Sequence, residues 1–225
     1  MSQLQTSDMV GYRLLQSLYN NTIRDFLPSK YRMLAGVAVH DTPLLDLTAD
    51  KKSYKQGLMS AIKKGVDPND EVELIGFGRG VSTVRALDAG ATRVTAYEAS
   101  ADMIELGTET VRANRPFDRR VSVEHAIVGD PIRIYGDYDD ARVVCPSELC
   151  TSDVLILDCE GSEKSVLESL GKLPETIICE THPERGVPVE TISQILEDNY
   201  ELQMYEYEPG IEHKKVILGE VLGSD

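Results

Sequence analysis

Acidic side chains and a histidine gather where two apolar stretches of the sequence end. The stretch "DVLILDCEGSE", residues 153–163, runs from four apolar residues into Asp158, Glu160 and Glu163, and "IICETHP" runs into Glu180 and His182. At the end of a buried strand, a carboxylate or an imidazole can orient a hydroxyl group or accept its proton. We therefore expect Asp158, Glu160 and His182 to be catalytic residues.

Each of these residues also has a structural alternative. Asp158 could be satisfied by loop N–H groups, and a lone histidine such as His182 is often a buried structural residue. Glu163 is expected to stabilise the start of the next helix, where a carboxylate opposes the helix dipole and binds free N–H groups. A further alternative is that Asp158, Glu160 and Glu180 converge on a hard divalent cation.

Three closely spaced glycines follow the first clear apolar strand, in "VELIGFGRGVST". Glycines there let the chain turn sharply and let a ligand approach main-chain N–H groups at the start of a helix. The next strand ends in Glu98, where a carboxylate can hold the ribose hydroxyls of an adenosine cofactor. The residues that we expect to bind the cofactor follow four predicted strands: Gly76, Gly78, Gly80, Glu98, Ala99, Ala126, Ile127 and Asp158.

The spacing of the glycines separates two classes of cofactor. A nicotinamide-binding turn reads G-x-G-x-x-G, whereas here the third glycine comes one residue early and Val81 occupies its place. The closer spacing, G-x-G-x-G, is typical of methyltransferases that use S-adenosylmethionine, a cofactor without phosphate. We expect S-adenosyl-L-methionine as the cofactor, and an NAD-dependent oxidoreductase is the less favoured alternative.

Strand and helix patterns alternate from residue 51 onward, as they do in a parallel sheet covered on both faces. The last two apolar runs, 200–208 and 213–222, are separated only by "PGIE", too short for a crossover helix, so they predict an antiparallel hairpin. We predict an α/β, Rossmann-like class I methyltransferase fold at 51–225, with a seven-stranded, mostly parallel sheet. Helices are expected at 51–64, 82–89, 101–114, 163–170 and 189–198.

The first 50 residues are predicted to be an N-terminal helical extension. Apolar residues recur at helical spacing over 7–27, and this amphipathic helix is a candidate contact surface for a homo-oligomer. The pattern of the segment up to Asp50 allows no assignment. Acceptor specificity is expected to lie in this extension and in the loop 131–152, neither of which carries a recognisable motif.

Composition restricts the partners. The formal net charge of −15, from 38 acidic and 23 basic residues, disfavours nucleic acid as a partner. No apolar run is long enough to span a bilayer and no signal peptide is evident, so we expect a cytoplasmic protein without a membrane role. Acidic residues spread along the chain suit solubility in high salt, and a halophilic, for example haloarchaeal, source is a hypothesis. The four cysteines show no C-x-x-C pair, so zinc and disulfides are not expected.

From about Tyr54 to Val221 the sequence resembles S-adenosylmethionine-dependent methyltransferases, and within them most closely the FkbM type. The resemblance rests on "HAIVGD", "IICETHP" and above all "DVLILDCEGSE", which is similar to the pattern I-D-x-x-K-I-D-x-E-G-x-E of that family. It implies O-methylation of a sugar hydroxyl or another small-molecule hydroxyl. Because the family is not recognised by a metal site, we expect no metal.

The chain departs from the FkbM pattern at several positions. The family's glycine turn reads D-x-G-x-N-x-G, where this chain has Leu74 and Gly78, and the family's lysine is replaced by Ile156. The missing aspartate is expected to help hold the amino group of the cofactor, so the chain resembles a divergent member. The alternative from a different class is a non-catalytic, methyltransferase-like scaffold that binds a nucleoside.

Overall fold

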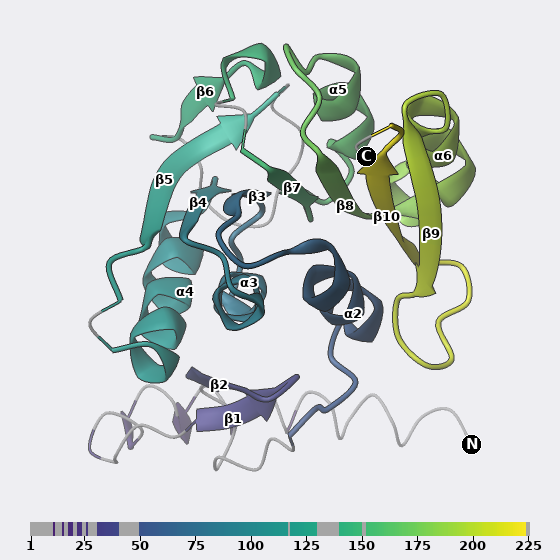
Figure 1. The fold of residues 1–225 in the computed structure, drawn as a ribbon. Helices are drawn as coiled ribbons and strands as arrows, with labels where there is room; N and C mark the ends of the chain where they lie inside the picture. The colour runs from purple at the N-terminus through teal and green to yellow at the C-terminus, as the bar shows by residue number, and fades with distance from the viewer. Residues whose placement is uncertain are drawn as a thin grey trace, which may run out of the picture.

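The computed structural model describes residues 31–40, 50–116, 118–129, 140–149 and 152–223, with isolated positions between 11 and 26. Figure 1 shows one twisted sheet with helices on both sides and a small hairpin beside them. Apart from those isolated positions, the helix predicted at 7–27 lies outside the described residues, and so does its proposed role in oligomer formation.

The main sheet has eight strands in the order β6-β5-β4-β3-β7-β8-β10-β9. Their bounds are β3 (Glu71–Ile75), β4 (Arg93–Glu98), β5 (Val121–Val128), β6 (Arg142–Val144), β7 (Val154–Leu157), β8 (Thr176–Glu180), β9 (Tyr200–Glu206) and β10 (Lys215–Val221). The strands from β6 to β8 are parallel, and β10 runs antiparallel to both β8 and β9. The predicted parallel sheet and terminal hairpin are therefore confirmed. The short β6, within the loop 131–152, adds one strand to the seven expected.

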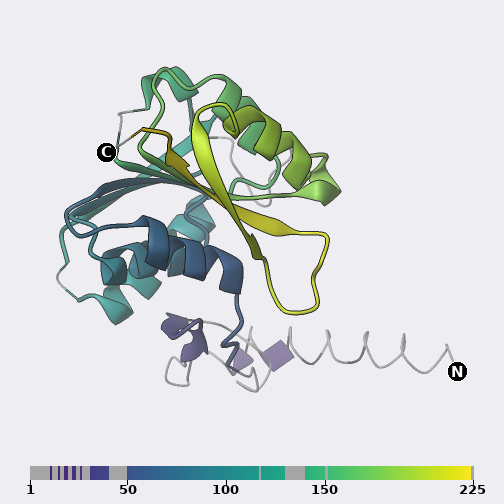
Figure 2. The same cartoon turned by 45° about the vertical axis from the view of Figure 1, so that its right-hand side comes forward.

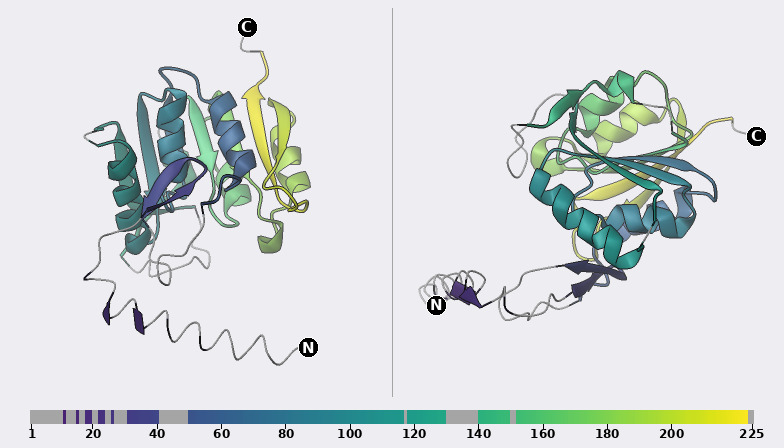
Figure 3. Two further views of the ribbon diagram at one scale, coloured as in Figure 1. Left: turned by 90° about the horizontal axis from the view of Figure 1, so that it is seen from below. Right: turned by 90° about the vertical axis from the view of Figure 1, so that its left-hand side faces the viewer.

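The helices form a layer on each face of the sheet (Figures 1 and 2). One layer contains α2 (Gln56–Gly65), α3 (Val81–Ala89) and α4 (Ala101–Asn114), and the other contains α5 (Glu163–Glu168) and α6 (Val189–Leu196). A hydrophobic cluster lies under each layer, and Figure 3 shows the layers from two further sides. Because both faces are covered, Val154–Leu157 is apolar and buried at every position. None of the described helices is both long and apolar enough to cross a bilayer.

Helix α2 begins five residues later than the predicted start at Lys51. The backbone of Lys51 is bound to the N-terminal hairpin, donating to the carbonyl of Met33 at 2.8 Å and accepting from the N–H of Ala35 at 3.0 Å. Lys55 then adopts a left-handed conformation, with φ 44° and ψ 45°, immediately before the first helical residue. The tertiary contact of Lys51 thus overrides local helical preference over residues 51–55.

Residues 31–40 are not helical, although the first 50 residues are predicted to be a helical extension; they lie in the segment whose pattern allows no assignment. They form a β-hairpin of β1 (Tyr31–Leu34) and β2 (Val37–His40), joined by a two-residue turn in which Ala35 and Gly36 both have positive φ. Such a turn matches the twist of paired strands. Alternating residues of the hairpin are buried in the core under α3 and α4. Apolar residues that recur at every second position can all lie on one face of a strand, so this spacing favours a strand here.

Candidate functional site

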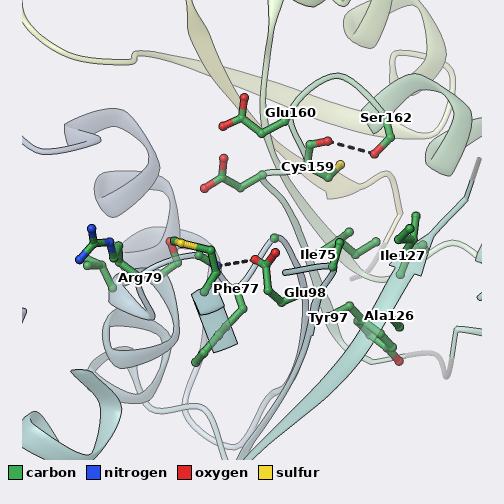
Figure 4. A pocket seen from close by; sticks show the side chains of 18 of the residues that line it. Ile75, Phe77, Arg79, Tyr97, Glu98, Ala126, Ile127, Cys159, Glu160 and Ser162 are labelled. Atoms are coloured by element: carbon green, nitrogen blue, oxygen red, sulfur yellow. Dashed lines mark hydrogen bonds between the residues drawn. The ribbon is translucent and has the colours of Figure 1, made fainter. Parts of the chain in front are cut away.

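A cavity of about 270 Å³ lies beyond the carboxyl ends of β3, β4, β5 and β7. The chain passes from β3 to β4 in one direction along the sheet and returns to β7 on the other side of β3, and ligands of open parallel sheets bind at such a reversal. Figure 4 shows residues around the cavity: Ile75, Phe77, Arg79, Tyr97, Glu98, Ala126, Ile127, Cys159, Glu160 and Ser162.

The three glycines of the turn after β3 have different roles. Gly76 has φ 95°, and a Cβ there would collide with the carbonyl of Asp158, so only glycine fits where the ends of β3 and β7 meet. Gly78 has φ 49°, and a Cβ there would point into open space beside the cavity. Gly80 is not among the residues that line the cavity, and its cofactor contact stays a prediction. A Cβ on Gly80 would lie 2.6 Å from the carbonyl oxygen of Gly107, so this glycine lets α3 pack against α4.

Glu98 lies at the end of β4 and its carboxylate faces the glycine turn (Figure 4). Its Oε2 accepts a hydrogen bond from Gly78 N–H at 2.8 Å, and its Oε1 accepts one from Ser100 N–H at 3.0 Å. Each carboxylate oxygen keeps capacity for a further donor. The predicted neighbours Ala99, Ala126 and Ile127 also line the cavity. Glu98 therefore fixes the glycine turn and still presents acceptors to a ligand hydroxyl.

Asp158 lines the cavity and forms an ion pair that the sequence did not reveal. Lys55 Nζ lies 2.5 Å from Asp158 Oδ2 and 3.1 Å from Glu180 Oε2. Burial, followed by the charge of Glu180, raises the pKa of Asp158 to about 6, despite the opposing charge of Lys55. The nearby carboxylates in turn outweigh burial and hold the pKa of Lys55 well above its usual range. The site thus contains a carboxylate with a raised pKa against a permanent cation.

Glu180 and His182 do not line the cavity, although we expected His182 to be catalytic. Both are fully buried, because residues 182–187 fold back and pair the backbones of His182 and Val187 through two 3.0 Å hydrogen bonds. His182 Nδ1 lies 2.7 Å from Glu163 Oε1, and its Nε2 lies 3.4 Å from Glu180 Oε1. His182 is therefore positioned as a buried counter-charge behind Asp158.

The pKa values of this buried group follow from its ion pairs. Burial would lower the pKa of His182, but the carboxylates of Glu163 and Glu180 raise it to about 10. Burial would raise the pKa of Glu180, but Lys55, His182 and Lys214 lower it to about 2. Lys214 Nζ lies 2.6 Å from Glu180 Oε1. At neutral pH, His182 is a cation and Glu180 is an anion.

The other two acids of the stretch 153–163 also have distinct positions. Glu160 lines the cavity, and its backbone is left-handed, with φ 54°. Glu163 begins α5, as expected, and its carboxylate accepts a hydrogen bond from Gly161 N–H at 3.1 Å. Its ion pair with His182 is a second role that its place at the helix start did not indicate. Of the three predicted catalytic residues, Asp158 and Glu160 thus reach the cavity.

The acidic cluster is poorly suited to binding a metal ion. Ligand atoms of Asp158, Glu180 and His182 lie within 4.8 Å of one another, which is a spacing that could hold an ion. However, Lys55 and Lys214 contact the same carboxylates, and a protonated imidazole has no lone pair for a metal. A divalent cation would meet three cations already in place, so the absence of a metal stays our prediction.

Two of the three departures from the FkbM pattern, Leu74 and Ile156, are neighbours in the sheet. Leu74 on β3 is the register partner of Ile156 on β7, and both side chains are fully buried in the cluster under α2 and α3. Neither residue lines the cavity. Glu73, on the opposite face of β3, is bound to Tyr97 and Ser152 and does not replace the missing aspartate. An aspartate at position 74 and a lysine at position 156 would lie side by side on one face of the sheet, where this chain has an aliphatic pair.

Comparisons by sequence give no match: no protein-family model matches the chain, and no curated protein does. Solved structures do resemble it. The magnesium protoporphyrin IX methyltransferase of Synechocystis PCC 6803 with bound S-adenosylmethionine is 13% identical, with a TM-score of 0.54 over 93% of this chain and 96% of that chain. The ribosomal protein L11 methylase of Lactobacillus delbrueckii subsp. bulgaricus is 13% identical, with a TM-score of 0.54 over 75% and 78%.

A third similar structure is the N-methyltransferase NodS of Bradyrhizobium japonicum WM9, which is 9% identical, with a TM-score of 0.52 over 76% of this chain and 95% of that chain. Identities this low establish an architecture, and the names of these proteins indicate different methyl acceptors. Together with the strand order and the terminal antiparallel hairpin, they show that the chain has the Rossmann-like α/β fold of the class I methyltransferases.

Proposed function

We propose that this protein is an S-adenosylmethionine-dependent methyltransferase that O-methylates a hydroxyl group of a sugar or small metabolite. The observation that carries the proposal is the cavity at the sheet edge, where the glycine turn after β3 and the carboxylate of Glu98 face the same space. The Synechocystis methyltransferase of similar fold contains this cofactor, which supports the assignment. We further propose a divergent FkbM-type enzyme, on the resemblance around Asp158.

The residues of the cavity fit this cofactor in charge and shape. The charged residues that line the cavity comprise two cations and three carboxylates: Lys55, Arg79, Glu98, Asp158 and Glu160. Carboxylates thus exceed cations by one, which suits a ligand that carries a sulfonium, an ammonium and one carboxylate. A dinucleotide with two phosphates would meet an unfavourable excess of negative charge. The open space beside Gly78 lets a ligand approach the main chain.

When bound, S-adenosylmethionine supplies a methyl group made electrophilic by its sulfonium. The chain must align an acceptor oxygen with that group and exclude water. Asp158 is well placed to accept the proton of the hydroxyl, because its side chain lines the cavity and its pKa is raised to about 6. Such a carboxylate is ionised above pH 6 and is a stronger base than an ordinary aspartate. Glu160, two residues after Asp158, places a second carboxylate at the cavity.

Glu180 and His182 contribute from behind the cavity wall. The negative charge of Glu180 helps to raise the pKa of Asp158, and protonated His182, together with Lys214, balances Glu180. We therefore assign these buried residues to electrostatic support of Asp158, while Asp158 faces the acceptor.

The scaffold alternative rested on Leu74, which replaces the family's aspartate. Leu74 lies in the hydrophobic core and its change is matched by Ile156 across the sheet. A paired exchange of this kind preserves packing without leaving a buried charge, so it does not argue for loss of catalysis.

Calorimetric titration with S-adenosylmethionine, S-adenosylhomocysteine and NAD tests the cofactor assignment. Glu98→Gln should weaken binding of the first two by about 10- to 100-fold, because a charged hydrogen-bond acceptor is lost. Glu105→Gln, which makes the same change on the exposed side of α4, is the matched control. Binding of NAD alone, or of no nucleoside, would contradict the assignment.

Turnover to S-adenosylhomocysteine with a panel of sugars and hydroxylated metabolites tests the reaction. Asp158→Asn should abolish most turnover. Cofactor binding with no turnover on any acceptor by the unaltered protein would favour the scaffold.

A further inference from the structure

Lys55 places an ammonium group in the cavity wall. Its side chain is 15% exposed and lines the cavity. An ammonium has three N–H donors, and the contacts with Asp158 and Glu180 account for two of them. Within the described part of the chain, Lys55 thus keeps one donor for a ligand acceptor.

The backbone at Lys55 is held in an unfavourable conformation by tertiary contacts. Its φ of 44° is in the left-handed region, which costs a residue with a Cβ about 1 kcal/mol or more. The carboxylate of Glu208 accepts a hydrogen bond from Lys55 N–H at 2.9 Å, and the carbonyl of Tyr207 accepts one from Gly57 N–H at 3.0 Å. The C-terminal hairpin therefore anchors the start of α2 and aims Lys55 at the cavity. Strain of this kind concentrates at ligand sites.

We infer that Lys55 binds the α-carboxylate of the amino-acid end of S-adenosylmethionine, an inference that rests on the proposed function. The strand order supports it: Glu98 ends β4, the glycine turn follows β3, and Asp158 with Lys55 lies at the end of β7, on the far side of β3. A ligand whose ribose is held by Glu98 and that passes the glycine turn reaches Lys55 with its other end.

The second cation of the cavity is less suited to this role. Arg79 Nη1 donates to the carbonyl of His40 at 3.1 Å, so its guanidinium is engaged with the N-terminal hairpin. Lys55, in contrast, is not the only counter-charge of Glu180, which is also contacted by Lys214 and His182. Lys55 can therefore form an ion pair with a ligand carboxylate while Lys214 and His182 remain paired with Glu180.

The test compares S-adenosylmethionine with decarboxylated S-adenosylmethionine, which differs by the carboxylate alone, in calorimetric titrations. The unaltered protein should bind the decarboxylated compound about 10- to 100-fold more weakly, the effect of one charged hydrogen bond. Lys55→Met should weaken S-adenosylmethionine by a similar factor and leave the decarboxylated compound almost unchanged. Lys55→Arg, which keeps the charge, should retain part of the preference.

Two control variants separate this role from structural effects. Lys214→Met removes the other lysine from Glu180 outside the cavity, and Arg79→Met removes the other cavity cation; neither should change the ratio of the two affinities. Melting temperatures check that each variant is folded. If Lys55→Met does not fold, Lys55→Gln, which removes the charge but keeps a hydrogen-bond donor, takes its place and should show the same selective loss.

The outcomes distinguish the two proposals. If the unaltered protein binds both compounds equally, or if Lys55→Met weakens both equally, Lys55 does not bind the carboxylate and the proposed function stands. If Arg79→Met weakened the binding of S-adenosylmethionine but not that of the decarboxylated compound, the inference would also be overturned. If the unaltered protein binds neither compound, the proposed function fails and this inference fails with it.

Discussion

The buried imidazole of His182 should make the stability of this protein fall as the pH rises above 6.5. The pKa of His182 is about 10 in the folded chain, against 6.5 for an ordinary histidine. Between these values the folded state holds one proton more than the unfolded state, so the free energy of unfolding falls by about 1.4 kcal/mol per pH unit. The stabilisation is complete below pH 6.5 and is lost as the pH rises towards 10. Between pH 7 and pH 9 the loss should be about 3 kcal/mol.

The variant His182→Gln isolates this contribution. It should be less stable than the unaltered protein at pH 7 by about 3–5 kcal/mol, since it leaves Glu163 and Glu180 buried without their shared cation. Urea unfolding at pH values from 6.5 to 9 would measure both proteins. The gap between them should narrow by about 3 kcal/mol from pH 7 to pH 9, because only the unaltered protein loses the ion pairs.

Groups that titrate identically in both proteins, such as the buried thiols, do not contribute to the difference between the two curves. His213→Gln is the matched control, because that histidine is exposed in the connection between β9 and β10 and is far from the buried carboxylates in sequence; the substitution should leave the curve unchanged. Parallel curves for the unaltered protein and His182→Gln would refute the conclusion that His182 is protonated in the folded state.

Three further outcomes follow from the structure. Gly76→Ala should destabilise the fold by several kcal/mol or prevent folding, since its Cβ would collide with the carbonyl of Asp158, whereas Gly78→Ala should cost only about 1 kcal/mol; equal effects in thermal unfolding would contradict this. Leu74→Asp alone should cost about 3–5 kcal/mol, and adding Ile156→Lys should recover part of the loss, because the two positions are register partners; strict additivity in a double-mutant cycle would contradict it. Dialysis against a chelator should not change the melting temperature, because lysine and histidine cations already balance the buried carboxylates; a drop restored by magnesium would contradict that expectation.

The sequence predicted those site residues whose position depends only on where a single strand ends. Glu98 and Gly76 reach the cavity because the carboxyl ends of neighbouring parallel strands meet at one edge of a sheet. Position at a strand end does not say where a side chain points, and His182 shows this. It follows β8 as expected, but the fold-back of residues 182–187 buries it behind the cavity.

Lys55 could not be predicted because its position depends on contacts distant in sequence. It lies in "KKSYKQG", which carries no motif, and it contacts a residue 103 positions further along the chain. Its orientation depends on the C-terminal hairpin, through Glu208. A pattern of local spacing contains no information on such a contact, so the main cation of the site was visible only in the folded chain.

The departures at positions 74 and 156 show how strand register changes the interpretation of a motif. In the sequence they are two separate differences from the FkbM pattern, an acid absent from the glycine turn and a base absent from the stretch before Asp158. In the fold the two residues lie side by side on adjacent strands, in the buried interior. Replacing one member of a buried opposite-charge pair leaves an uncompensated charge, which costs about 3–5 kcal/mol, whereas replacing both with well-packed aliphatic residues is often neutral or stabilising. On the proposed FkbM relation the two differences count as one coupled exchange in the core. The charged pair that lines the cavity is Lys55 with Asp158, and Asp158 directly follows the last register pair of β3 and β7.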